Sequence, residues 1–461
     1  MKKIFASALF AALFAATVFA QAETVALTVD QALELAAERN RTLKSAEIDL
    51  EIKERASKYS WNVFFPTVQA SFTAARTTDI DGTLEQLNSM SQMAATLQTL
   101  TTKNQTYYIP VTAQEKHHWA LVGNIGASLN LSLAYIGQIQ AAKADYEGGK
   151  ITWEKSQKET LMNIKKLFYG LLLQQEALAV KNATLENARQ RASQAEANYR
   201  NGLIPELRLL NAQVTYENQK PEVESAEQSL NQQLDTFAFL IGLPVGTKIQ
   251  LVGSIEPVYV NVDSDGLLEK YSESSLDIRS LQSNIEVLKC NLNALNFSSF
   301  TPALALNYGW QPTKSFFSDS SKWTDQGNLT ITLAWNLTNM LPFSANRQKA
   351  KDLQANLKKL ELAMETLKEN QKVQVKKAVD TLNQARKQID SMGRNITLAQ
   401  RAYDSSARSY RNGATELLDL RDSESQLNQA KLGQLNQKFN YISALMDLEY
   451  TLNADLSAYK E

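Results

Sequence analysis

Apolar residues recur every seven positions along two long stretches of the chain, with mostly polar residues between them. A strict seven-residue repeat is typical of α-helices that pack as coiled coils with a left-handed supercoil. The pattern predicts two very long helices, over residues 138–200 and 346–411. The first repeat is Ile164, Leu171, Leu178, Leu185, Ala192 and Tyr199, and the second is Val375, Leu382, Ile389, Ile396, Tyr403 and Tyr410.

The two stretches are copies of one plan. Each ends in the residues Tyr-Arg-Asn-Gly, at 199–202 and again at 410–413. An internal repeat of this kind indicates a duplicated architecture. Shorter helices are expected over 29–62, 202–241, 266–296 and 413–453. We therefore expect a first structural repeat over 23–244, an equatorial linker of short strand and loop over 245–265, and a second repeat over 266–461.

Between the helices, four segments alternate apolar and polar residues with a period of two, which predicts β-strands. They are 66–76, 121–133, 303–310 and 328–337. Each is about ten residues long, the length that a tilted transmembrane strand needs. Aromatic residues bracket the strands, with Trp61 and Phe65 on the helix side and Trp119 and Trp323 on the loop side. This arrangement is typical of strands that face lipid, although a soluble sandwich would also bury one apolar face.

Four strands cannot close a barrel in a single chain, and an open edge in lipid leaves backbone groups without partners. Several copies must then pool their strands, and three copies would supply twelve. The predicted fold is mainly α, with a duplicated long-helix coiled-coil tube and a small β-barrel part. The long connection over 77–118 is expected to be partly helical around 84–100.

Composition narrows the function classes. The 461 residues carry 48 Lys and Arg against 49 Asp and Glu, whereas a nucleic-acid binder normally has a basic excess. The single cysteine, Cys290, excludes an intramolecular disulfide. The adjacent His117 and His118 lack a third ligand, and no phosphate loop or nucleophile elbow is present. The sequence predicts no enzyme, no metal site and no cofactor.

The N-terminus has the features of a secretory signal peptide over residues 1–22: Lys2 and Lys3, then an apolar segment, then Ala20-Gln21-Ala22 as a cleavage site. Beyond it no apolar run is long enough for a transmembrane helix. The sequence therefore predicts export, with any membrane insertion made by strands.

With this duplicated helix–strand–strand–helix plan and its two Tyr-x-x-Gly motifs, the chain resembles the TolC-like outer-membrane efflux proteins over nearly its whole mature length. The resemblance implies a homotrimer in outer-membrane lipid, with a twelve-stranded barrel, a periplasmic tube of twelve helices and an equatorial waist. It implies docking to a periplasmic adaptor (membrane fusion) protein and an inner-membrane transporter. It also implies that substrates pass without chemistry.

The resemblance assigns roles to residues near the two motifs. Tyr199, Gly202, Tyr410 and Gly413 would form the helix tips and the adaptor docking site. Relatives carry acids six and nine residues after the second tip glycine, and these narrow the periplasmic entrance. Here those positions are Asp419 and Asp422, which would form a negative channel constriction that favours cations. The alternative is that they are two exposed carboxylates near a helix start, where the helix dipole favours them.

Tyr410 matches a residue that, in relatives, helps to latch the inner helices to their neighbours. The chain departs from the family at Arg208, where relatives have the acid that partners this tyrosine. Arg208 or Arg421 is therefore expected to act as a latch or counter-charge for the acids.

The sequence as a whole predicts an outer-membrane channel with a large periplasmic extension, in a tripartite efflux or type I secretion system. The alternative is a structural coiled-coil envelope protein or stalk without transport activity. Such a stalk explains the seven-residue repeats but not the four strands, and it would wash off membranes with salt or alkali.

Overall fold

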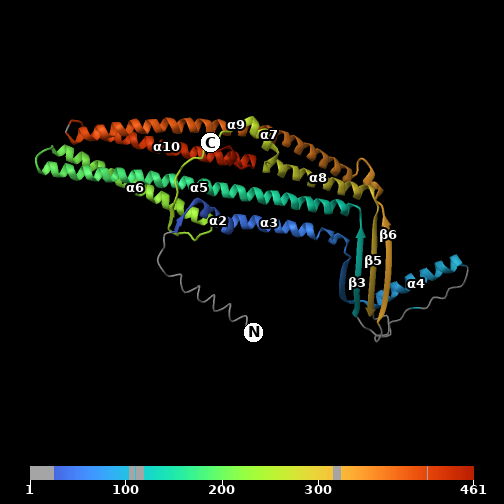
Figure 1. Ribbon diagram of the computed structural model, residues 1–461. Helices are drawn as coiled ribbons and strands as arrows, with labels where there is room; N and C mark the ends of the chain where they lie inside the picture. The colour runs from blue at the N-terminus through green and yellow to red at the C-terminus, as the bar shows by residue number, and fades with distance from the viewer. Residues whose placement is uncertain (1–24, 103–109, 111–118, 315–322, 413, 461) are drawn as a thin grey trace, which may run out of the picture. The chain divides into compact units, whose positions relative to one another are not determined.

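The computed structural model describes residues 25–102, 110, 119–314, 323–412 and 414–460 (Figure 1). The expected signal peptide, the histidine pair and Gly413 lie outside the described residues. The chain forms two compact units. The first, which we call the helical unit, comprises residues 1–53, 147–283 and 361–461, and the second, the strand unit, comprises 54–146 and 284–360.

Long helices dominate the chain. Helices α5 (Ala134–Arg200) and α9 (Ala345–Arg411) have 67 residues each, and each is followed by a return helix, α6 (Glu206–Leu240) or α10 (Leu417–Leu452). The seven-residue repeats that predicted the long helices are buried at half of their positions, as at Ile164 and Leu171 in α5 and at Val375 and Leu382 in α9. The remaining helices are α2 (Val29–Arg39), α3 (Arg41–Lys58), α4 (Ile80–Thr102), α7 (Ser264–Tyr271) and α8 (Leu276–Phe300).

Two of the helices expected to be continuous are interrupted. The helix expected over 29–62 divides at Asn40, whose side-chain oxygen accepts hydrogen bonds from the backbone N–H groups of Thr42 (2.8 Å) and Leu43 (3.1 Å). These bonds satisfy donors that the first turn of α3 leaves free. The Asn40 amide also donates to the Leu240 carbonyl at 2.7 Å. The helix expected over 266–296 is likewise divided, between α7 and α8.

The expected linker contains strand β4 (Ile249–Leu251), which pairs in parallel with strand β1 (Val25–Leu27). Both strands pack on a core that includes Phe168, Leu171 and Phe237, which are at most 1% exposed. Further along the linker, Val260 donates its backbone N–H to the Tyr441 hydroxyl at 3.0 Å. These contacts hold the linker against α5, α6 and α10.

Two glycines beside this core allow a matched test of packing. Gly242 has φ +79° and Gly246 has φ +87°, a left-handed conformation that costs alanine roughly 1 kcal/mol. A Cβ on Gly242 would lie 3.0 Å from the Arg39 carbonyl oxygen, whereas one on Gly246 would have nothing within 4 Å. We expect Gly242→Ala to lower the free energy of unfolding by about 2–3 kcal/mol and Gly246→Ala by about 1 kcal/mol. Thermal unfolding followed by circular dichroism measures both, and equal losses would contradict the close packing at Gly242.

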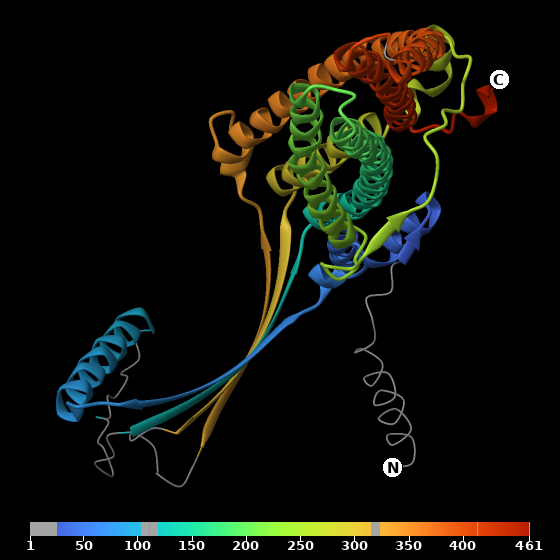
Figure 2. The ribbon, with the colours of Figure 1, turned by 90° about the vertical axis from the view of Figure 1, so that its left-hand side faces the viewer.

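The strand unit contains one antiparallel sheet in the order β2-β3-β5-β6 (Figure 2). Its strands are β2 (Thr67–Arg76), β3 (Trp119–Leu131), β5 (Ala303–Lys314) and β6 (Thr324–Ala334). They occupy the four segments in which the alternation predicted strands, with bounds shifted by up to four residues. Helix α4 lies in the long connection that was expected to be partly helical.

The strand register sorts the side chains onto two faces. One row across the sheet is Val68, Ala127, Tyr308 and Leu329, and the adjacent row is Thr67, Ser128, Asn307 and Thr330. The apolar face therefore continues across all four strands, and much of it is exposed, with Phe72 at 65% and Leu333 at 71%. The polar face is hollowed, and Gln69, Ser71 and Asn124 are among the residues that line the hollow. None of the helices that the structure describes is long and apolar enough to cross a bilayer.

Candidate functional site

The turn between α5 and α6 is the first of the two helix tips. Gly202 has φ +71°, its N–H donates to the Tyr199 carbonyl (2.8 Å), and the Leu203 N–H donates to the Asn198 carbonyl (2.9 Å). These two bonds form a Schellman motif, which closes the end of α5 and requires a residue that tolerates positive φ. The Tyr-x-x-Gly motif thus encodes a sharp helical turn, with Tyr199 40% exposed at its edge.

The turn between α9 and α10 has corresponding backbone bonds. The Ala414 N–H donates to the Ser409 carbonyl (2.9 Å), with the same spacing as the Leu203–Asn198 bond. Tyr410 is half-buried, and α10 begins at Leu417. The two copies of the motif therefore end their long helices in similar ways.

Asp419 and Asp422 lie in the first two turns of α10. Their spacing of three places both on one side of the helix, and both are exposed, whereas the neighbouring Leu420 and Ser423 are buried. Asp419 accepts a hydrogen bond from the Thr415 hydroxyl at 2.7 Å. The positive end of the helix dipole favours carboxylates at this place. The arrangement presents two carboxylates to solvent near the tip.

Among the described residues, no ion pair joins these acids to the two arginines that were expected to balance their charge. Arg208 and Arg421 are exposed, and in the described part of the chain neither forms an ion pair. The hydroxyls of Tyr199 and Tyr410 form no hydrogen bond to any described residue. The structure therefore places Asp419 and Asp422 on one side of α10, and among the described residues neither Arg208 nor Arg421 forms an ion pair with them.

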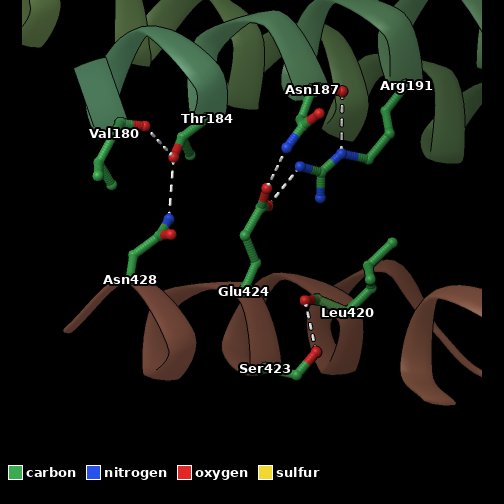
Figure 3. Close-up of polar contacts among 8 residues, drawn as sticks. All are labelled: Val180, Thr184, Asn187, Arg191, Leu420, Ser423, Glu424 and Asn428. Atoms are coloured by element: carbon green, nitrogen blue, oxygen red, sulfur yellow. Dashed lines mark hydrogen bonds and ion pairs between the residues drawn. The ribbon is translucent and has the colours of Figure 1, made fainter. Parts of the chain in front are cut away.

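A buried polar network, which was not predicted from the sequence, joins α5 to α10 behind the tips (Figure 3). Glu424 forms an ion pair with Arg191, and their side chains are only 6% and 15% exposed. The second oxygen of Glu424 accepts a hydrogen bond from the Asn187 amide at 2.8 Å. The Arg191 Nε–H in turn donates to the backbone carbonyl of Asn187 at 3.0 Å. Each charged group is therefore paired and hydrogen-bonded, as a buried charge requires.

The network continues along the same two helices. The Asn428 amide donates to the Thr184 hydroxyl at 2.9 Å, and Thr184 donates to the Val180 carbonyl at 2.9 Å. Burial raises the pKa of the Tyr403 phenol, and the Glu424 charge raises it further. A signal in the sequence could have revealed the pair, because Arg191 lies eleven residues before Gly202 and Glu424 eleven residues after Gly413.

Among the residues that the structure describes, no group of three or more His, Cys, Asp and Glu side chains is placed to hold a metal ion.

Comparison with solved structures shows the fold. CusC is 16% identical to this chain, with a TM-score of 0.68. The match covers 95% of this chain and 96% of CusC. The outer membrane channel CmeC of Campylobacter jejuni is 14% identical with a TM-score of 0.72, and covers 93% of this chain and 88% of its own. The outer membrane channel MtrE of Neisseria gonorrhoeae, solved in an open state, is 18% identical to this chain, with a TM-score of 0.64. The match covers 93% of this chain and 89% of MtrE.

Sequence comparison gives the family. No curated protein matches the chain at a significant level. The family model described as "Outer membrane efflux protein" matches residues 32–243 and 267–454, which include both helical hairpins and all four strands of the sheet. The chain belongs to the outer membrane efflux protein family.

Proposed function

We propose that this protein is the outer-membrane channel of a tripartite efflux or type I secretion system. It conducts substrates, without chemistry, from an inner-membrane transporter and a periplasmic adaptor to the exterior. The observation that carries this proposal is the sheet of the strand unit, with one continuous exposed apolar face and one hollowed polar face. That distribution fits a wall with lipid on one side and water on the other.

The two edge strands support assembly from several copies. Strands β2 and β6 each pair on one side only, so their outer backbone groups lack partners within the sheet. In lipid each such group costs several kcal/mol, and pairing β6 of one copy with β2 of the next removes the cost. Three copies would close a barrel of twelve strands in the outer membrane, with the helices extending into the periplasm.

The helix tips provide the periplasmic end. Tyr199, Gly202, Tyr410 and Gly413 form the surface on which the adaptor docks. Asp419 and Asp422 of several copies form the constriction, because three copies of two exposed carboxylates create a ring that attracts cations and repels anions. Arg208 and Arg421, unpaired within the described part of one chain, are available as counter-charges from a neighbouring copy.

One pair of substitutions tests this proposal. Ile331 lies on the apolar face of β6 and is 65% exposed, while its neighbour Thr330 lies on the polar face. Arginine on a lipid-facing strand costs about 2–4 kcal/mol per chain, so Ile331→Arg should greatly reduce the trimer recovered from outer membranes. Thr330→Arg should assemble at close to the wild-type yield.

The measurement is the yield of trimer in the outer-membrane fraction after an alkaline wash. If the wild type itself washes off, and the two arginine variants behave alike, the sheet does not face lipid. The structural-stalk alternative would then be the better account.

A further inference from the structure

The polar face of the sheet carries no charged side chain in the four described strands. These strands contain three charged residues, Arg76, Lys314 and Asp325, all close to the strand ends that lead into the loops. The register places all three in rows of the apolar face. The polar face instead carries hydroxyl and amide side chains, as in the row that begins at Thr67. This face is therefore polar and electrically neutral.

A hollow of about 480 Å³ lies on this face, over β2, β3 and β5. Its volume is in the range of small-molecule sites. Six of the residues that line it have hydroxyl or amide side chains, namely Thr67, Gln69, Ser71, Asn124, Ser128 and Asn307. None of the six forms a side-chain hydrogen bond with another described residue. Their donors and acceptors are therefore available to a ligand or to water.

Two glycines leave space at the floor of the hollow. One row across the sheet is Gln69, Gly126, Gly309 and Asn328, so its two central positions have no side chain. A Cβ on Gly309 would lie 2.8 Å from Asn328 Oδ1, so the Asn328 amide already covers that position. A Cβ on Gly126 would meet no atom closer than 3.7 Å, and Asn124 Oδ1 would lie 3.9 Å away. The open space therefore lies over Gly126, with amide groups around it.

These groups favour a ligand without charge. A charged group that gives up its hydration needs an opposite charge beside it, and this face offers none. Hydroxyl and amide side chains both donate and accept hydrogen bonds, as the hydroxyls of a sugar do. We propose that the hollow binds an uncharged, polyhydroxylated molecule, of the chemical class of an oligosaccharide. The inference rests on the proposed function, because it takes the polar face as the wall of the lumen, and it adds the class of molecule that this wall recognises.

The site binds weakly, which suits a wall along which molecules pass. Each hydrogen bond to the ligand replaces one to water, so the net gain per bond is small. Conduction requires binding that is favourable enough for entry and weak enough for release. Since the wall is neutral, selection by charge is left to the proposed constriction at Asp419 and Asp422.

Interruption of single-channel current by maltohexaose tests the site. The full-length trimer is placed in a planar bilayer, and the sugar is added at millimolar concentration to both sides. We expect brief, resolved interruptions whose frequency rises with the sugar concentration. Gln69→Ala/Asn124→Ala should weaken the apparent affinity about fivefold, because two hydrogen-bonding side chains of the hollow are lost. The ion current without sugar should stay close to that of the wild type.

A matched control removes two amides from the same face outside the hollow. Gln311 and Gln326 pair with each other across β5 and β6, and neither lines the hollow. Gln311→Ala/Gln326→Ala should therefore bind maltohexaose like the wild type.

A third variant tests the space rather than the polar groups. Gly126→Val keeps every hydroxyl and amide of the hollow and adds a branched side chain at its floor. Valine suits a β-strand, and a Cβ at this position has only ordinary contacts. The variant should form trimers by native mass spectrometry and conduct, while the interruptions by maltohexaose disappear.

The outcomes separate this inference from the proposed function. Channels that conduct, but that maltohexaose interrupts equally in the wild type and all three variants or not at all, would overturn the binding site alone. Folded trimers that carry no current would overturn the proposed function and the binding site with it.

Discussion

Replacing both Asp419 and Asp422 with alanine is expected to abolish cation selectivity and, because the shorter side chains widen the proposed constriction, to raise single-channel conductance several-fold. Both carboxylates are exposed at the start of α10, so three copies would place six negative charges around the entrance. A unit charge about 8 Å away contributes roughly 0.5 kcal/mol in water, and physiological salt screens part of the sum. A net 1.4 kcal/mol would give about a tenfold preference for cations. Conductance and reversal potential in a planar bilayer measure both effects.

A matched control removes the same charge elsewhere. Glu361 and Glu365 are exposed acids of α9, far along the helix from the tip. Glu361→Ala/Glu365→Ala should conduct like the wild type and keep its selectivity. If both double variants conduct and select alike, the protein remains a channel but the aspartates do not form its constriction.

Glu424→Gln is expected to cause the largest loss of stability, about 3 kcal/mol. The substitution leaves the Arg191 guanidinium, which is 15% exposed, without the carboxylate that neutralises it. The Asn187 amide still has an acceptor in the glutamine oxygen, so the change acts on the ion pair. Thermal unfolding followed by circular dichroism should show a clear fall in midpoint temperature.

Two comparisons isolate the cause. Glu186→Gln breaks the exposed ion pair with Arg189, whose side chain is 62% exposed, and should cost less than about 1 kcal/mol. Arg191→Met/Glu424→Met removes both charges and should recover most of the lost stability. If Glu424→Gln were no worse than Glu186→Gln, the α5–α10 network would not hold the two hairpins together.

The sequence was informative wherever one pattern continued over many residues. The seven-residue repeat from Ile164 to Tyr199 predicted α5 because a coiled-coil seam must keep facing its partner for its whole length. The strands were also recognisable, because a sheet with one polar and one apolar face requires strict alternation, as at Leu329, Ile331 and Leu333.

Features that depend on single side chains were not predicted. The division of the first helix depends on three hydrogen bonds of the Asn40 side chain, one of them to Leu240, which is 200 residues away. The pairing of β1 with β4 involves only three residues in each strand, too few for a periodic signal. Arg191 and Glu424 look like ordinary surface charges in the sequence, since only their position between packed helices buries them.

The candidate site also contains one feature that the sequence predicts and others that it does not. The turn at Gly202 follows from the Tyr-x-x-Gly motif, because a Schellman motif needs glycine. The roles proposed for Asp419, Asp422, Arg208 and Arg421 involve neighbouring copies, so neither the sequence nor the fold of one chain determines their partners.

The most direct test of the central claim is the current carried by the purified wild-type protein in a planar bilayer. We expect discrete steps of small, cation-selective conductance from preparations that native mass spectrometry shows to be trimers. Folded trimers that insert and carry no current would contradict it.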